Sequence, residues 1–390
     1  MLESLTTATE PPFVYVYNPL DQDMLYVRHR LLVEPELTRI WSNSTRACCA
    51  APSGVVVDVG SNFGWYAMLS LSLGCSVVAF EPVEAYQDVL RLAAHLNGQA
   101  FARRLTLYGN AVLDRPGNFS MLVPLAGVSR APSSAQPRGE KALPTGPPTL
   151  SSHMRTMMGM AALLGPRGQA AVKDVAALSP GTLTYKQPVG AVRLDALVAQ
   201  PLCMLKIDIE GLEPQALGSA RRLLSLQPVQ VVQLEINRKK PQACANVRML
   251  RNLLLFGFVL HKVEHTKACW HGECVHAHAA RSVASLLSSE LAPSWRGAAA
   301  PTPSTVDAVG AWAAAEALSV YERLTEYSWN LVAYQQRGRG PLGWLLPDAP
   351  LPRAQIAACR TGFGFPFRVP VHAGGGPRRW ARRNERSEMT

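Results

Sequence analysis

VVVDVGSNFGWYAMLSLSLGCSVVAFEP, residues 55–82, is the stretch that decides the fold. The short apolar runs at its two ends are typical of parallel strands buried on both faces, and the run 65–73 between them predicts a helix. Gly60 and Gly64 permit a sharp turn after the first strand and a close approach of a ligand to the backbone. The stretch therefore predicts a β-α-β unit whose turn contacts a ligand.

An aspartate in this turn indicates which ligand that is. The string DVGSNFG, residues 58–64, lacks the Gly-x-Gly-x-x-Gly pattern that holds a dinucleotide pyrophosphate. Asp58 would repel a pyrophosphate, but it suits a ligand that carries an ammonium and a sulfonium group, as S-adenosylmethionine does. Glu81 ends the second strand, about 20 residues past the glycines, where an acid accepts hydrogen bonds from ribose hydroxyls. The alternative is a structural turn with a chance acid.

A second block, residues 191–237, repeats the order of strand, acidic turn, helix and strand. Residues 202–207 predict the strand, and Asp208, Glu210 and Glu213 crowd the turn after it. Ligands of open α/β sheets bind outside the carboxyl ends of the strands, so we expect this turn to face the same crevice as the first. The apolar positions of the helix that follows recur at helical spacing: Ala216, Leu217, Ala220, Leu223 and Leu224.

Six segments carry a family resemblance: DVGSNFGWYA (58–67), AFEP (79–82), GNAVLDRPG (109–117), RLDAL (193–197), LKIDIEGLE (205–213) and QLEIN (233–237). In these segments the chain resembles the FkbM family of S-adenosylmethionine-dependent methyltransferases, over residues 12–265. The resemblance implies an α/β class I methyltransferase fold: a Rossmann-like, doubly wound, mostly parallel seven-stranded sheet. It also implies methylation of a hydroxyl oxygen on a small molecule, a sugar or other glycan, or a lipid-linked acceptor.

The same segments supply the candidate site residues. For the cofactor we expect Asp58, Gly60, Ser61, Asn62 and Gly64 around the methionine part, Glu81 on the ribose with Pro82 beside it, and Asn110 with Ala111 near the adenine. Asp208 is the expected base or acceptor-orienting carboxylate, Glu210 is the alternative, and Glu235 is expected to position the acceptor. Crowding of like charges would raise the pKa of at least one carboxylate there. Helix capping and turn chemistry are the other interpretation of these acids.

The domain organisation follows from composition along the 390 residues. We expect an N-terminal hairpin and helix in 1–50, a methyltransferase domain in 51–280, and an Ala-rich helical extension with an irregular basic tail in 281–390. Within the domain, residues 124–188 form a flexible insert that is a candidate lid over the acceptor pocket.

Three local elements are expected in the less regular parts of the chain. Runs 13–17 and 24–27 predict a hairpin against the main sheet, and 153–164 has a helix-like, methionine-rich pattern. Residues 306–334 are the longest helix candidate.

Charge and hydropathy favour a soluble cytoplasmic enzyme, although organellar placement stays open. The formal net charge is +11, but the basic residues are scattered apart from a run at 378–386, and RNA-binding signatures are missing. The start of the chain lacks the pattern of a secretory signal, and no run reaches the ~18 apolar residues of a membrane span. RNA or protein methylation, a nicotinamide oxidoreductase and a non-catalytic protein of the same fold are the rival functions.

Cysteines and acids bear on redox state and metals. A chain of this size without a secretory signal is expected to keep its eight cysteines reduced, with Cys48, Cys49 and Cys75 as small apolar fillers. Five histidines and two cysteines fall between 261 and 278, yet their spacing is not that of a zinc site. The acids after residue 207 also lack the spacing of a known metal loop, so we expect a metal-independent reaction.

Overall fold

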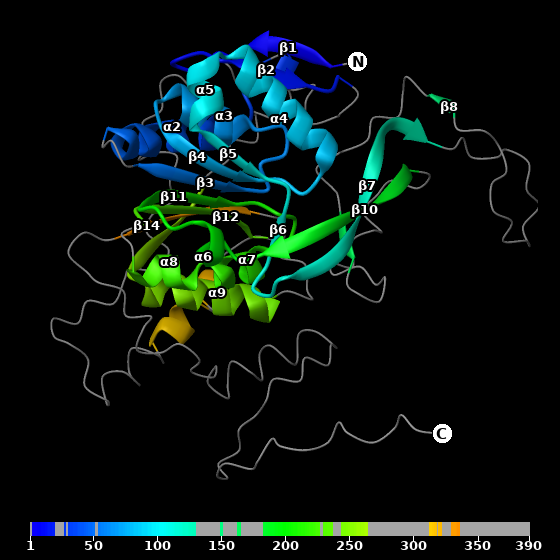
Figure 1. Cartoon of the computed structure of the whole chain (residues 1–390). Helices are drawn as coiled ribbons and strands as arrows, with labels where there is room; N and C mark the ends of the chain where they lie inside the picture. The colour runs from blue at the N-terminus through cyan, green and yellow to red at the C-terminus, as the bar shows by residue number, and fades with distance from the viewer. Residues whose placement is uncertain are drawn as a thin grey trace, which may run out of the picture.

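The computed structural model is a mixed α/β protein built on one large, mostly parallel sheet (Figure 1). It describes residues 2–19, 27–28, 30–50, 54–129, 149–150, 162–164, 182–226, 229–236, 243–263, 312–317, 319–321 and 329–335. The large sheet has seven strands in the order β13-β14-β12-β11-β3-β4-β5. Their bounds are β3 Val55–Val59, β4 Ser76–Phe80, β5 Leu105–Tyr108, β11 Leu202–Ile207, β12 Val231–Ile236, β13 Phe258–Lys262 and β14 Trp329–Gln335.

The direction of chain travel creates a switch point in the centre of this sheet. From β3 the chain moves through β4 to β5 on one side, and from β11 it moves to β12 on the other, with all these strands parallel. In open α/β sheets, ligands bind at the carboxyl ends of the strands where the order reverses. The switch point lies between β3 and β11, the strands that precede the two predicted turns.

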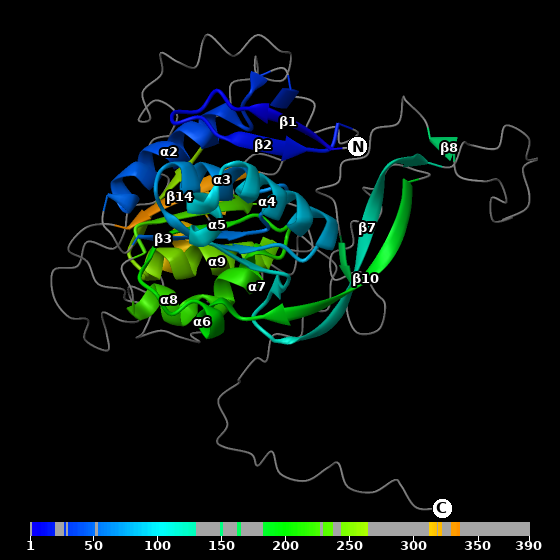
Figure 2. The same cartoon turned by 45° about the horizontal axis from the view of Figure 1, so that its top comes forward.

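Helices cover both faces of the sheet, as the buried, continuously apolar strands require (Figures 1 and 2). On one face are α2 (Pro35–Cys49), α3 (Trp65–Ser72), α4 (Glu84–Leu96) and α5 (Gln99–Arg104). On the other are α6 (Leu194–Leu197), α7 (Glu213–Ser219), α8 (Arg221–Leu226) and α9 (Ala243–Leu255). The single helix predicted after Glu213 is divided into α7 and α8 at Ala220. Its predicted apolar positions are nevertheless all buried. Across the described residues, none of the helices is both long and apolar enough to span a membrane.

The predicted N-terminal hairpin exists with a different first strand and a different position. β2 (Val14–Tyr17) pairs antiparallel with β1 (Glu3–Thr6). Of the expected partner run 24–27, Val27 is helical and residues 24–26 lie outside the described residues. The pair packs on α4, where the side chain of Asn97 bonds both the amide and the carbonyl of Val14. The hairpin thus lies on the helical layer that covers the sheet.

The prediction of one helix over residues 306–334 is wrong at its C-terminal end. Residues 312–317 and 319–321 are helical, but β14 begins at Trp329 and inserts antiparallel between β12 and β13. The sheet therefore takes an internal strand from beyond residue 280, where we placed the start of the extension. The domain boundaries themselves remain predictions.

A second, smaller sheet projects from the first (Figures 1 and 2). Its strands are β6 (Ala111–Val112), β7 (Gly117–Ser129), β8 (Thr149–Leu150), β9 (Ala162–Leu164) and β10 (Thr182–Val192). The long antiparallel ladder of β7 and β10 forms both ends of the predicted insert, so 124–129 and 182–188 are strands rather than a flexible excursion. The end of the helix-like run 153–164 is also a strand, β9, while 153–161 lie outside the described residues.

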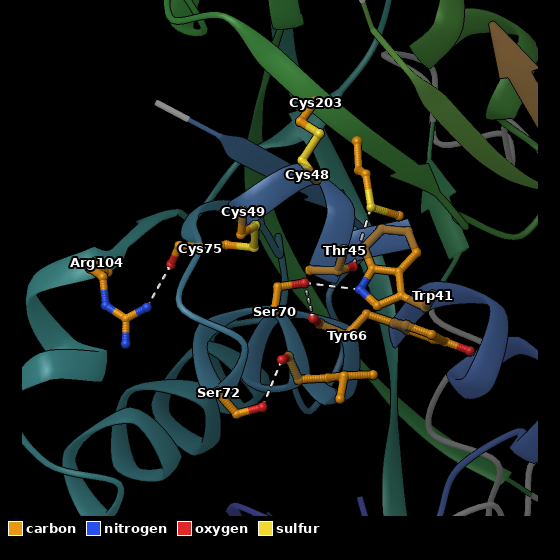
Figure 3. The surroundings of a disulfide bond; sticks show 12 residues. Trp41, Thr45, Cys48, Cys49, Tyr66, Ser70, Ser72, Cys75, Arg104 and Cys203 are labelled. Atoms are coloured by element: carbon orange, nitrogen blue, oxygen red, sulfur yellow. Dashed lines mark hydrogen bonds between the residues drawn. A yellow bond between two sulfur atoms is a disulfide. The ribbon is translucent and has the colours of Figure 1, made fainter. Parts of the chain in front are cut away.

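Two disulfides fasten the end of α2 to the sheet (Figure 3). Cys48 pairs with Cys203 and Cys49 pairs with Cys75, with Cα atoms 5.8 and 5.1 Å apart. The expectation that Cys48, Cys49 and Cys75 are reduced apolar fillers is therefore wrong. The partners are 155 and 26 residues apart in the chain, and they meet because the last turn of α2 lies beside the amino ends of β11 and β4. Such proximity leaves no local spacing signal in the sequence.

Candidate functional site

The glycine turn after β3 touches the acidic turn after β11. Gly60 has a φ of +77°, and a Cβ there would lie 2.0 Å from the backbone oxygen of Asp208. Gly64 has a φ of +86°, and its Cβ would lie 2.1 Å from Leu90 Cδ1. Both positions therefore favour glycine for backbone angle, and at Gly60 the neighbouring backbone oxygen also leaves no space for a side chain. The two predicted turns are packed together at the switch point, as the sequence predicted.

Glu81 holds the glycine turn in shape. Its two carboxylate oxygens accept hydrogen bonds from the backbone amides of Asn62 (2.7 Å) and Val83 (2.9 Å). Asn62 has a φ of +51°, so this bond supports a backbone conformation that is unfavourable for a residue with a side chain. Burial raises the pKa of Glu81 to about 7. This structural role was not predicted, and ribose binding by Glu81 remains a prediction.

The other turn residues complete this loop. The Ser61 hydroxyl donates to the backbone oxygen of Asp58 at 2.9 Å, so Ser61 closes the turn on itself. The side-chain oxygen of Asn62 is buried and has no hydrogen-bond partner. The loop thus presents one unpaired acceptor that its own backbone does not use.

A row of buried polar side chains crosses three strands below the turns. Asp58 is next to Lys206 in the register of β3 and β11, and Lys206 is next to Gln233 in the register of β11 and β12. The Lys206 ammonium lies 3.1 Å from Asp208 Oδ2 and 3.9 Å from Asp58 Oδ1. Burial would lower the pKa of Lys206, but Asp208, Asp58 and Glu34 together raise it, so the ammonium stays charged.

Asp58 is the most deeply buried acid of the site. It is fully buried, and neither of its carboxylate oxygens has a hydrogen-bond partner of normal geometry. Burial raises its pKa, while the charge of Lys206 opposes the shift. A buried carboxylate that lacks hydrogen-bond donors, and that shares its one neighbouring ammonium with Asp208, suits a cationic, hydrogen-bond-donating ligand.

The acidic turn after β11 is organised by Glu213, the first residue of α7. Glu213 Oε1 accepts hydrogen bonds from the amides of Ile209 (3.0 Å) and Gly211 (2.9 Å). Its second oxygen, Oε2, is buried without a partner. Burial raises the pKa of Glu213 to about 7. In the same turn Glu210 has a φ of +56°, so both turns contain a non-glycine residue in the left-handed region.

Glu235 of β12 joins this turn across the sheet. Carboxylate oxygens of Asp208, Glu213 and Glu235 all lie within 4.8 Å of one another. Burial, followed by the charges of Asp208, Glu210 and Glu213, raises the pKa of Glu235 well above its usual value. Two of the three predicted catalytic positions, Asp208 and Glu235, thus form one group with Glu213, which the sequence placed in the turn without assigning it a role. Glu210, the third, lies in the same turn as Asp208 but is not part of this group.

The predicted adenine positions lie where the two sheets join. Asn110 donates through Nδ2 to the Gly190 oxygen of β10 at 3.1 Å, and Ala111 begins β6, which pairs with β10. Gln187 of β10 donates to the Pro82 oxygen at 2.6 Å and accepts from the Glu84 amide at 3.2 Å. Gln187 therefore ties the second sheet to the loop after β4.

Sequence reasoning missed Gln187 as a structural support of the site. It allowed Lys206 to pair with one acid of the turn that follows it, but it did not foresee the second pairing, with Asp58. Lys206 and Gln233 had a readable signal, because they are polar residues within strands that are otherwise apolar. Gln187 had none, because its bonding partners are more than 100 residues away.

The site residues fit S-adenosylmethionine in charge and in hydrogen-bonding capacity. The orphaned acceptors of Asp58 and Asn62 are oxygens, which is what an ammonium donor and a positive sulfur require. The nearest cation, Lys206, is already engaged by two aspartates. The residues present therefore leave negative charge for a cationic ligand.

Comparison with known proteins gives a family. The model of the methyltransferase FkbM domain matches residues 58–260, just over half of the chain. No curated protein sequence matches the chain. Among solved structures, the crystal structure of methyltransferase FkbM from Methylobacillus flagellatus KT is similar at 14% identity and a TM-score of 0.28, over 47% of this chain and 32% of that one. The chain thus spans about a third of that protein's length, and the likeness carries no argument about fold. The matched residues include both turns and all four strand-end acids described above, and the chain belongs to the FkbM methyltransferase family.

Proposed function

We propose that this chain is an S-adenosylmethionine-dependent methyltransferase that methylates a hydroxyl oxygen of a small molecule, a sugar or a lipid-linked acceptor. The observation that carries the proposal is Asp58, a fully buried carboxylate at the switch point whose two oxygens have no hydrogen-bond partner and whose neighbouring cation, Lys206, is shared with Asp208. The strand order, with only β14 reversed among the seven, supports the doubly wound class I arrangement.

The cofactor supplies a methyl group that its positively charged sulfur makes electrophilic. In this proposal Asp58 and Asn62 accept hydrogen bonds from the amino-acid part, and Glu81, Asn110 and Ala111 line the nucleoside part. Gly60, Ser61, Gly64 and Pro82 shape the loops. These assignments rest on the unpaired oxygens and on position at the strand ends.

Asp208 is the proposed base. Its Oδ2 accepts from Lys206, so Oδ1 is the atom that would receive the acceptor's hydroxyl proton. Glu235, which lies beside Asp208 and whose pKa is raised by burial and by the neighbouring carboxylates, would position the acceptor. Glu210 is the alternative base in the same turn.

Calorimetric titration of the full chain with S-adenosylhomocysteine, beside a matched titration with NAD, tests the cofactor. Micromolar binding of the first and none of the second supports the proposal, and NAD binding would favour the oxidoreductase. Asp58→Ala should weaken S-adenosylhomocysteine roughly 10- to 100-fold, because a charge-assisted hydrogen bond is lost. Failure of both ligands to bind would favour a non-catalytic protein.

Asp208→Asn separates chemistry from binding. It should leave S-adenosylhomocysteine affinity within about twofold and lower turnover of a hydroxylated acceptor roughly 100- to 10,000-fold, because a general base is lost. Full activity of this variant would remove Asp208 as the base. An acceptor screen that includes RNA and protein substrates distinguishes the alternative substrate classes.

A further inference from the structure

Three carboxylates from two neighbouring strand ends converge at the acidic turn. Asp208 follows β11, Glu213 begins α7, and Glu235 lies near the end of β12, with one oxygen of each within 4.8 Å of the others. In octahedral coordination by oxygen, adjacent ligands of Mg²⁺ are about 3.0 Å apart and opposite ligands about 4.2 Å apart, since each metal–oxygen distance is about 2.1 Å. A small inward movement of the side chains would therefore suffice for one ion.

A second observation points to a ligand at this place. Glu213 is 1% exposed, its Oε1 is engaged by two backbone amides, and its Oε2 is buried with no partner. A buried carboxylate oxygen without a donor is costly, unless a proton or a cation meets it. Hydrogen bonding within the turn accounts for Oε1 of Glu213, but it does not account for the burial of Oε2.

The local charge balance also favours a cation. Among Asp58, Asp208, Glu213, Glu235 and Lys206, four are carboxylates and one is an ammonium, which already bonds Asp208 through Oδ2. Mutual repulsion of carboxylates is relieved by protonation or by a bound metal ion. An all-oxygen set selects a hard cation over zinc or copper.

We propose that Asp208, Glu213 and Glu235 bind one hard divalent cation, Mg²⁺ or Mn²⁺. Asp208 would use Oδ1, the oxygen that Lys206 leaves free, and Glu213 would use Oε2. The sequence expectation of a metal-independent reaction considered only the acids of one turn, and it did not include Glu235 from the next strand.

The catalytic consequence rests on the proposed function. A cation held by these three residues would have open positions for an acceptor oxygen, and a hydroxyl bound there is more acidic. With the ion bound, Asp208 Oδ1 would be a ligand in place of the base, and the hydroxyl proton would pass to Glu210, the alternative base of the proposed function. This narrows the acceptor to molecules whose hydroxyl group can reach a metal ion together with the methyl donor.

Titration of the chelator-treated full chain with MnCl₂, followed by the electron paramagnetic resonance signal of free Mn²⁺, tests the site directly. We expect one ion per chain with a Kd below about 1 mM, and displacement by MgCl₂. Glu213→Gln and Glu235→Gln should each weaken binding at least about tenfold, because each removes a charged ligand. The matched control is Asp88→Asn, which removes an exposed carboxylate on α4 and should bind as wild type does.

Absence of stoichiometric binding by the wild-type chain would overturn the proposal, as would Mn²⁺ binding by both Gln variants that is as tight as that of the wild-type chain. Circular dichroism of each variant confirms its fold, and if one misfolds the other decides. S-adenosylhomocysteine titration with and without Mn²⁺ separates the two proposals: cofactor binding without ion binding removes only the cation site, and ion binding without cofactor binding removes only the methyl donor.

Discussion

The two turns at the switch point are built in the same way, but they leave different atoms free. Each follows a central parallel strand, contains a non-glycine residue with positive φ, and is held by a buried glutamate that accepts hydrogen bonds from two backbone amides. Glu81 uses both oxygens for this purpose, whereas Glu213 uses only Oε1. In the first turn the unused acceptors are those of Asp58 and Asn62. In the first turn, one side chain, Glu81, holds the backbone, and other side chains keep free oxygens for a ligand. In the second turn Glu213 does both.

Breaking the contact between the two turns should lower the unfolding free energy more than any other change considered below. In Gly60→Ala the new Cβ would overlap the Asp208 backbone oxygen, and φ is +77°, so we expect a loss of unfolding free energy of at least about 4 kcal/mol. Gly74→Ala is the matched control, because its φ of +97° carries strain but nothing lies within 4 Å of the new Cβ. It should lose only about 1–2 kcal/mol. Urea unfolding measures both, and equal losses would show that the turns do not depend on their contact.

The amino ends of β11 and β4 differ from the carboxyl ends of the central strands, because disulfides link them to α2. Removing the shorter crosslink in a Cys49→Ser, Cys75→Ser double variant should lower the unfolding free energy by about 3–4 kcal/mol, from the entropy regained by the unfolded chain. Alkylation of the protein after unfolding without reductant, followed by mass spectrometry, should find Cys48, Cys49, Cys75 and Cys203 unmodified. Since disulfides persist mainly in oxidising compartments, modified thiols would instead support the reduced state expected from the sequence.

The central strands and the strand-end acids were predictable, because parallel strands bring their carboxyl ends to one edge. Asp58, Glu81, Asp208 and Glu235 could therefore be placed together without coordinates. β14 could not, because the apolar residues of Trp329–Gln335 continue an Ala-rich run that also matches helical spacing, and pairing with β12 decides between the two. The partner of β2 and the disulfide pairs were missed for the same reason, since each depends on a contact between segments that local pattern does not encode.

The unfolding free energy of the wild-type chain should depend on pH more strongly than that of Glu213→Gln. Burial raises the pKa of Glu213 from 4.5 to about 7, so the folded state binds its proton more tightly than the unfolded state does. The stabilisation is complete below pH 4.5 and is lost as the pH rises through 7. In chelator, the wild-type chain should therefore lose about 2 kcal/mol relative to Glu213→Gln between pH 5 and pH 8. Urea titrations at the two pH values check this, and a pH-independent difference would mean that Glu213 titrates normally.

The smallest effect should be the most direct test of the difference between the two glutamates. The two carboxylate oxygens of Glu81 each accept from one backbone amide. A glutamine offers only one oxygen, so in Glu81→Gln one of these amides faces an NH₂ group and loses its acceptor. In Glu213→Gln the side-chain oxygen can keep both amides at the position of Oε1, and the NH₂ group replaces the unpaired Oε2. At one pH and in chelator, Glu81→Gln should therefore be less stable than Glu213→Gln by about 1–3 kcal/mol. If instead both variants lost the same stability in urea, the second oxygen of Glu213 would have to be engaged in solution as fully as those of Glu81, and the two turns would not differ in what they leave free for a ligand.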